Sequence, residues 1–244
     1  MDFDKIAHYY DAMYVDPDAY RQEVRFACSL ITRYQDTNGY ALLDLACGTG
    51  EQCSYFSECF AVTGLDLSAE MLKCARAKFP NLRFVQGNMF DFSFPAPFDA
   101  IANLYGSVGF ADGKEQLAQG IACAYRHLKP GGVFLLTPWS TKETFEEKLV
   151  TDTRTSGDIS FCRMESVRRI AEDKVRIEMH HLIGNGLSIE EHSGEQLITL
   201  FSEAEYRDAL EQAGFTIRER LTEEQFRMGA FVCTKEKTKG EPTV

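Results

Sequence analysis

Long apolar runs are absent from this chain of 244 residues. None approaches the roughly 20 residues that a membrane-spanning helix needs, so we expect no membrane partner. The first residues, MDFDKIAHYYDAMY, are acidic and aromatic, whereas a secretion signal is basic and then apolar. The sequence therefore predicts a cytoplasmic protein.

Basic residues are also in short supply. The chain has 26 lysines and arginines against 37 aspartates and glutamates, which gives a net charge of −11. Its one local basic cluster, residues 163–169, is interrupted by Glu165. Because a nucleic-acid-binding protein usually presents a basic surface to the phosphates, the composition argues against a nucleic-acid partner.

Metal-binding patterns are missing as well. The eight cysteines include no C-x-x-C pair, and none has the spacing from a histidine that is typical of a zinc finger. Most of them stand in apolar surroundings, as buried free thiols do. We therefore expect reduced cysteines and no metal.

What the chain does have is a regular alternation of apolar runs and helical patterns through its first 140 residues. A helix between the second and third runs begins after Ser68, which can cap it, and ends at Pro80. Such alternation predicts βαβ units and a parallel sheet, hence a doubly wound α/β fold. The predicted strands are Ala41–Cys47, Ala61–Leu67, Leu82–Gln86, Phe98–Leu104 and Gly132–Trp139.

The pattern differs on both sides of this core. Asp16 and Pro17 open a helix before it, since proline suits the first helical position. After residue 140, β-like stretches predict two or three antiparallel strands, and a capping box at 202–205 then opens a helix that ends at Gly214. We divide the chain into an N-terminal helical lid (1–36), a core (37–139 and 200–236), an antiparallel insertion for substrate or dimer contacts (140–199) and a tail (237–244). We expect the polar residues from Lys235 to Val244 to be disordered.

A glycine turn follows the first predicted strand, in the sequence Asp44-Leu45-Ala46-Cys47-Gly48-Thr49-Gly50. Glycine lets a ligand approach the backbone, and the N-terminus of the next helix suits an anion. A dinucleotide-binding turn needs a third glycine where this chain has Cys53. The turn alone is also compatible with a purely structural role.

Two further signals follow the next two strands. Asp66 ends the second strand, where a carboxylate can hold both hydroxyls of a ribose, and Asn88-Met89 follow the third, where they can contact an adenine. The three signals converge on the edge of the sheet at which doubly wound folds bind ligands. Their combination predicts an adenosine-containing cofactor.

Longer stretches carry a family resemblance. DLACGTG, GLDLSAEML, QGNMFDF and HLKPGG resemble the motifs of class I S-adenosylmethionine (SAM)-dependent methyltransferases. YYDAMY, PWSTKETF, RIEMHH and QLITLFSEAEYRDALEQAGF resemble the TDP-aminosugar N,N-dimethyltransferases of macrolide pathways. The resemblance implies a Rossmann-like, seven-stranded sheet whose last strand is antiparallel. It also implies methylation of a small molecule in secondary metabolism, most simply at an amine nitrogen, with S-adenosylhomocysteine as product, and it suggests a homodimer.

The resemblance also implies a set of cofactor-binding residues. Tyr20 would lie beside the methionine moiety, Ala46 and Gly48 beside the sulfonium, and Asp66 at the ribose. The family usually has aspartate in place of Asn88, and asparagine keeps an acceptor for the adenine amino group. The full set is Tyr20, Ala46, Gly48, Gly50, Asp66, Leu67, Met71, Asn88, Met89, Asn103 and Leu104.

On the acceptor side, Tyr10 matches a tyrosine that lies over the reacting amine in the sugar enzymes, and it is our candidate catalytic residue. This chain departs from that subgroup in having Phe110 where the others have histidine or tyrosine, and Ser140 in place of the second residue of a Trp-Trp pair. The predicted substrate residues are Tyr14, Phe110, Trp139, His181 on an inserted strand, and Arg227, which matches an arginine of a glycine-rich segment.

Three alternatives stay open at this point. An O-methyltransferase would use the same fold, because only the substrate pocket selects the nucleophile. An NAD-dependent oxidoreductase would share the glycine turn and the ribose carboxylate, and a non-catalytic SAM-binding protein would share the whole cofactor motif. No residue of the sequence is an obvious general base, although its histidines are candidates.

Overall fold

The computed structural model describes residues 3–237, so almost all of the predicted tail lies outside the described residues. The N-terminal part and the first βαβ units contain α1 (Phe3–Ile6), α2 (Tyr10–Tyr14), α3 (Pro17–Tyr34), β1 (Ala41–Leu45), α4 (Glu51–Phe56), β2 (Ala61–Asp66), α5 (Ala69–Lys78) and β3 (Arg83–Gln86). The middle contains β4 (Phe98–Asn103), the 3-10 helix η1 (Ser107–Phe110), α6 (Lys114–Arg126) and β5 (Leu128–Leu136). Then follow β6 (Lys148–Ser156), β7 (Ile159–Arg169), β8 (Lys174–Asn185), β9 (Ser188–Thr199), α7 (Glu203–Ala213), β10 (Phe215–Leu221) and β11 (Ala230–Lys235).

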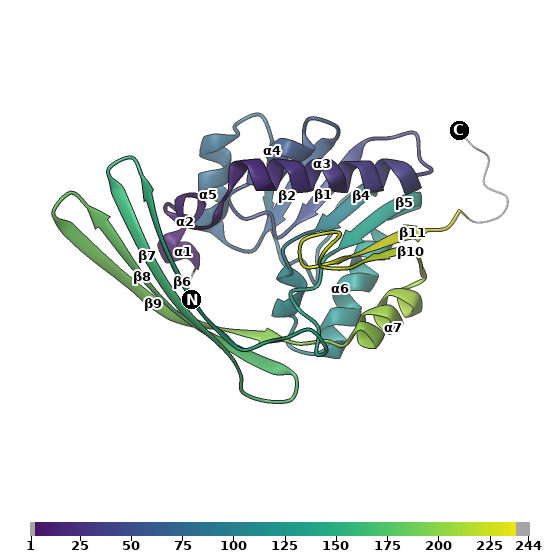
Figure 1. Cartoon of the computed structure of the whole chain (residues 1–244). Coiled ribbons are helices and arrows are strands. Elements are labelled where there is room, and N and C mark those ends of the chain that lie inside the picture. Colours follow the sequence, from purple (N-terminus) through teal and green to yellow (C-terminus); the bar gives the residue numbers. More distant parts are fainter. Residues whose placement is uncertain (1–2, 238–244) are drawn as a thin grey trace.

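The core is a seven-stranded sheet in the order β10-β11-β5-β4-β1-β2-β3. All of its strands are parallel except β11, which is antiparallel to both β5 and β10. One apolar cluster joins α3, α4 and α5 to one face of the sheet, and a second joins α6 and α7 to the other (Figure 1). The predicted doubly wound α/β fold with its antiparallel last strand is therefore confirmed.

The predicted helix ends are also confirmed. The Asp16 side chain accepts a hydrogen bond from the Ala19 N–H at the start of α3, and the Ser68 hydroxyl accepts one from the Met71 N–H at the start of α5. At α7, Ser202 and Glu205 form the reciprocal capping box. Each cap satisfies an N–H that the first turn of a helix leaves without a partner.

The fifth strand differs most from its predicted bounds, whereas the first four differ by one or two residues at one end. The fifth strand begins at Leu128 instead of Gly132 and ends at Leu136 instead of Trp139. Leu128 already pairs with Phe98, and a register irregularity absorbs the extra residues before Val133 pairs with Ala100. The Lys-Pro-Gly-Gly stretch looks like the end of a helix in sequence but lies within a strand, because pairing with β4 overrides its local turn propensity.

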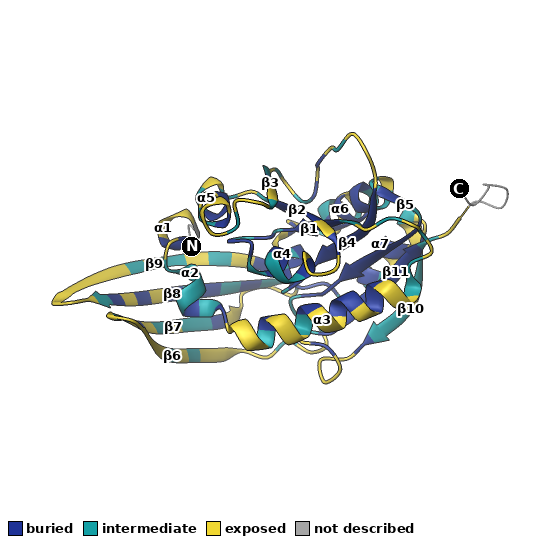
Figure 2. Cartoon of the chain, turned by 90° about the horizontal axis from the view of Figure 1, so that it is seen from above, coloured by how far each residue is buried: buried dark blue, intermediate teal, exposed yellow. Residues whose placement is uncertain are grey.

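The insertion forms a second sheet of four antiparallel strands, β6-β7-β8-β9, rather than two or three. The sequence did not reveal β6, because its residues are polar and mostly exposed, so the alternation that marks a half-buried strand is missing. Figure 2 shows this sheet extending beyond the core, with α1 and α2 lying against it. Ile6 and Met13 of these helices pack on Phe161 and Ile183 of the sheet.

Within residues 3–237, no helix is both long and apolar enough to cross a membrane.

Candidate functional site

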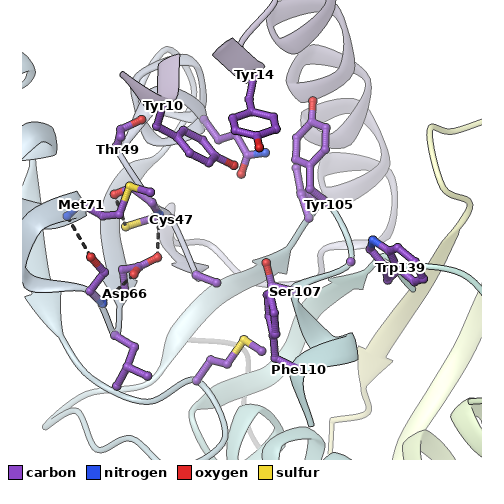
Figure 3. A pocket seen from close by; sticks show the side chains of 18 of the residues that line it. Tyr10, Tyr14, Cys47, Thr49, Asp66, Met71, Tyr105, Ser107, Phe110 and Trp139 are labelled. Atoms are coloured by element: carbon purple, nitrogen blue, oxygen red, sulfur yellow. Dashed lines mark hydrogen bonds between the residues drawn. The ribbon is translucent and has the colours of Figure 1, made fainter. Parts of the chain in front are cut away.

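A cavity of about 790 Å³ opens at the C-terminal ends of the parallel strands. Its walls come from the turns after β1 to β4, from α1 and α2, and from β8 and β9 of the second sheet. Figure 3 shows Asp66 on one side of the cavity and Tyr10, Tyr14 and Tyr105 on the other. Most of the predicted site residues line it: Tyr10, Tyr14, Tyr20, Ala46, Gly48, Asp66, Leu67, Met71, Asn88, Met89, Leu104, Phe110, Trp139 and Arg227. Three predicted residues, Gly50, Asn103 and His181, do not.

The glycine turn after β1 has a strained backbone. Ala46, Gly48 and Gly50 have φ angles of +61°, +54° and +79°, a region in which glycine is favoured. A Cβ added at Gly48 would meet nothing within 4 Å, so its open face borders the cavity. A Cβ at Gly50 would lie 2.8 Å from the ring of Phe84. Gly50 is therefore needed for helix–strand packing, it does not line the cavity, and its contact with the cofactor stays a prediction.

Asp66 connects the turns after β1 and β2. Its carboxylate accepts a hydrogen bond from the Gly48 N–H (2.8 Å) and another from the Ser68 N–H (2.9 Å). Burial raises the pKa of this carboxyl, and the hydrogen bonds from the backbone act in the opposite direction. Each oxygen keeps acceptor capacity for a ligand hydroxyl. A ribose held here would bring its cofactor alongside the open face of Gly48, so the residues present fit SAM.

The turn after β3 carries Asn88 and Met89. The Asn88 side-chain oxygen accepts a hydrogen bond from the Phe90 N–H at 3.0 Å. Asn103 is buried behind this turn, and its side-chain amide donates to the Leu45 carbonyl (2.9 Å) and contacts the Met89 sulfur (3.6 Å). Asn103 therefore supports Met89 and the end of β1, it does not line the cavity, and its contact with the cofactor stays a prediction.

On the acceptor side, Tyr10 and Tyr14 come from α2, with their ring centres 4.9 Å apart (Figure 3). The Tyr14 hydroxyl lies 3.0 Å from Glu165 Oε1 and 2.7 Å from His181 Nε2. His181 is fully buried behind Tyr14. It does not line the cavity and contacts Tyr14, which does, so its expected contact with the substrate stays a prediction.

Tyr105 also lines the cavity, and the sequence analysis missed it. It stacks on Tyr20 at 4.6 Å, donates a hydrogen bond to Glu23, and lies 5.2 Å from the guanidinium of Arg227. Its φ of +57° is unusual for a bulky residue. The signal that could have revealed it is an aromatic residue directly after the fourth strand and before Gly106, at the edge where ligands bind.

The N-terminal helices are tied to the cofactor turns, a second feature that the sequence analysis missed. Asp4 hydrogen-bonds with the Ser68 hydroxyl, and Asp11 hydrogen-bonds with Thr49 and forms an ion pair with Lys78. Since Asp4 and Thr49 also line the cavity, α1 and α2 close the same space that the glycine turn opens.

The second sheet contributes Ile177 and residues 195–198 to the cavity wall, next to Phe110 and Trp139. The backbone at Gly106 approaches Trp139 so closely that an added Cβ would lie 2.2 Å from its Cα. Among the described residues of the wall, Arg227 is the only lysine or arginine, whereas Asp4, Glu51, Asp66 and Glu195 are acidic. Within residues 3–237, no three histidine, cysteine, aspartate or glutamate side chains are grouped so that they could hold a metal ion.

Known proteins resemble this chain in sequence and in structure. A model described as a methyltransferase domain matches residues 42–132. The dTDP-3-amino-3,4,6-trideoxy-alpha-D-glucopyranose N,N-dimethyltransferase of Streptomyces venezuelae is 35% identical over 77% of this chain and 80% of its own. The dTDP-3-amino-3,6-dideoxy-alpha-D-glucopyranose N,N-dimethyltransferase of Streptomyces fradiae is 32% identical over 87% of this chain and 84% of its own.

Among solved structures, that of DesVI from Streptomyces venezuelae superposes with a TM-score of 0.83 and 32% identity, covering 88% of this chain and 91% of DesVI. The SAM-bound structure of CalS10, an amino pentose methyltransferase from Micromonospora echinaspora, superposes with a TM-score of 0.81 and 28% identity. That match covers 93% of this chain and 94% of CalS10.

Proposed function

This chain belongs to the SAM-dependent methyltransferases, in the family of the sugar N,N-dimethyltransferases, and from that premise we propose that it methylates the amino nitrogen of an aminosugar. The observation that carries the proposal is one continuous cavity with two different walls. Asp66 and Gly48 form one wall, and Tyr10, Tyr14 and the second sheet form the other. A cofactor and an acceptor can therefore meet in the same enclosed space.

We assign the cofactor to the wall at the strand ends. Asp66 would bind the ribose hydroxyls, Asn88 and Met89 the adenine, and the open face of Gly48 the methionine moiety. SAM supplies a methyl group on a positively charged sulfur, which is already a good leaving group. The remaining task of the protein is to hold the acceptor nitrogen about 3 Å from that methyl and in line with it. Helices α1 and α2 contribute Asp4, Tyr10 and Tyr14 to the wall and would shield the reacting groups from water.

For the acceptor we propose a sugar linked to a nucleoside diphosphate, which is the substrate class in the printed names of the two sequence relatives. Arg227 is the cationic group of the described cavity wall and would bind a phosphate oxygen. Tyr10 would lie over the reacting amine. The aromatic surfaces of Phe110 and Trp139 would pack against the sugar ring.

Turnover of defined acceptors tests this proposal. Purified protein is mixed with SAM and with dTDP-3-amino-3,6-dideoxyglucose, with the same aminosugar lacking the nucleotide, or with the dTDP-sugar whose amine is replaced by hydroxyl. S-adenosylhomocysteine and the methylated sugar are measured by mass spectrometry. We expect transfer to the nitrogen of the dTDP-linked amine. Methylation of the hydroxyl analogue alone would show an O-methyltransferase, and SAM binding without any turnover would contradict the proposed reaction.

The homodimer and the cytoplasmic location stay predictions. Size-exclusion chromatography with light scattering tests the first, and fractionation of cells that express the chain tests the second.

A further inference from the structure

We propose that Tyr14 and His181 form a proton relay that removes a proton from the ammonium form of the acceptor. This inference rests on the proposed N-methyl transfer, because an amine attacks a methyl group only after it has lost a proton and exposed its lone pair. The sequence offers no obvious base for that step. The structure supplies one behind the cavity wall.

The relay begins at the cavity surface. Tyr14 lines the cavity beside Tyr10 (Figure 3), and its hydroxyl lies 2.7 Å from His181 Nε2. His181 belongs to β8 and is paired with Arg163 of β7, two residues from Glu165. Alternate residues of a strand share a face, so Glu165 and His181 lie on the face of the sheet that Tyr14 contacts. The imidazole thus reaches the acceptor only through the Tyr14 hydroxyl.

The surroundings of His181 favour the neutral ring, which is the form that can accept a proton. Burial is the largest cause that lowers its pKa, and the charge of Arg163 and the ring of His192 act in the same direction. The Glu165 carboxylate and the backbone at His192 oppose them. Arg163 in turn forms ion pairs with Asp152 and Glu165, at 3.7 and 3.6 Å.

The transfer balances as two coupled steps. The Tyr14 hydroxyl can donate its one hydrogen to Glu165 Oε1 (3.0 Å) or to His181 Nε2 (2.7 Å), and the relay uses the second orientation. One N–H bond of the ammonium breaks and its proton bonds to Tyr14 Oη, while the hydrogen of Tyr14 passes to His181 Nε2. The amine keeps the electron pair with which it attacks the methyl carbon. Tyr14 stays neutral throughout, as it must, because burial and Glu165 raise the pKa of its hydroxyl.

Protonated His181 is stabilised by the carboxylate of Glu165, which already lies beside it. His181 Nε2 lies 3.9 Å from Glu165 Oε1, so protonation completes an ion pair. The Glu165 side chain is 12% exposed, which gives the proton a route to solvent before the next turnover. Tyr14 touches the acceptor and is the catalytic residue, whereas His181 and Glu165 act through it.

The experiment compares His181→Gln and Tyr14→Phe with the intact enzyme, using kcat at saturating SAM and aminosugar between pH 6 and 10. Glutamine can still accept the Tyr14 hydrogen bond but cannot take its proton. We expect kcat at pH 7 to fall about 100-fold in each variant, the magnitude of general base catalysis. The loss should shrink toward zero above the pKa of the amine, where the acceptor is already neutral. The matched control is His180→Gln, the neighbouring histidine, which is exposed and points to the opposite face.

A loss that is equal at every pH, or no loss in His181→Gln, would overturn the relay and leave a packing role. A variant that fails to fold is recognised by its melting temperature. In that case the pH dependence of kcat in the intact enzyme is the test. If the relay operates, kcat stays constant well below the pKa of the amine. If kcat instead rises with pH along the titration of the amine, the relay is overturned. Absence of amine turnover in the intact enzyme would instead refute the proposed function.

Discussion

The cavity has two walls that are held in place by different means. The cofactor wall consists of the turns at 46–49, 66–68 and 87–90, and its Asp66 carboxylate is held by backbone N–H groups. The acceptor wall consists of Tyr10, Tyr14, Tyr105, Phe110, Trp139, Arg227 and residues 195–198, and its contacts are made mostly between side chains. The cofactor position is therefore determined by backbone groups, which few side-chain substitutions can displace. The acceptor position is set by side chains that can be exchanged one at a time.

The largest expected effect comes from breaking the cofactor wall at Asp66. Asp66→Ala removes two charge-assisted hydrogen bonds to the ribose and releases the Gly48 and Ser68 N–H groups. We expect SAM binding to weaken by about 4 kcal/mol, roughly 1,000-fold, by titration calorimetry. Asp158→Ala, in the exposed turn between β6 and β7, is the control and should leave the affinity unchanged. Unaltered binding in Asp66→Ala would show that this wall does not hold the cofactor.

The second prediction concerns Asp44, which is fully buried beneath the cofactor wall and accepts a hydrogen bond from the Cys53 thiol at 3.1 Å. Burial raises the pKa of Asp44 to about 7, while the Cys53 hydrogen bond lowers it and the charge of Asp66 raises it. The folded chain therefore binds a proton more tightly than the unfolded chain does. Its stability should fall as the pH rises from about 4 to 7.

Replacing Asp44 by asparagine removes this titration. At pH 8 we expect Asp44→Asn to be more stable than the unaltered chain by about 4 kcal/mol, with the difference vanishing near pH 4. Urea unfolding across this range measures it. An equal stability difference at every pH would mean that Asp44 does not titrate in this window.

A smaller effect is expected at Gly48. Its alanine variant places a methyl group in the open face of the turn and should weaken SAM binding about 30-fold, or 2 kcal/mol. Gly157→Ala is a matched control, because Gly157 has a φ of +58° and its added Cβ also meets nothing within 4 Å. Both variants should lose about 1 kcal/mol of stability from backbone strain. Weaker SAM binding in both would mean that strain, and not lost space, is the cause.

The smallest effect is expected on the acceptor wall. Arg227→Met should raise the KM of the dTDP-linked aminosugar about tenfold, or 1.4 kcal/mol, while SAM affinity stays constant. Arg126→Met, at the exposed end of α6, should change neither. A parallel loss of SAM binding in Arg227→Met would show that the two walls are not independent.

The contrast between the cofactor wall and the acceptor wall also explains which site residues could be predicted from the sequence. The cofactor wall lies within 50 residues, and each part follows a strand, so glycine, aspartate and asparagine at strand ends revealed it. Residues 195–198 could not be found in this way, because they reach the cavity only where β9 folds against it and nothing local in their sequence marks them. Tyr105 does follow a strand, but its partners Tyr20 and Arg227 are distant in the chain.

Local signals also explain which elements were predicted. The caps of α3, α5 and α7 were readable because the side chains involved lie within three residues of each other. The start of β5 depends on its pairing with β4, and β6 exists because it pairs with β7. His181 was singled out as a residue that could face the substrate. Its actual neighbour, Tyr14, is 167 residues away in the chain, which no spacing rule could indicate.

The β6–β9 sheet is joined to the core through only two stretches of chain, residues 137–147 and 200–202. Its strands pair with one another and with none of the core strands, so their polypeptide can be exchanged without altering any hydrogen bond of the seven-stranded sheet. The core that binds the methyl donor and the sheet that lines the acceptor wall can therefore change independently in evolution. A lineage can retain its methyl-donor site and acquire a new acceptor by recombination at these two crossings.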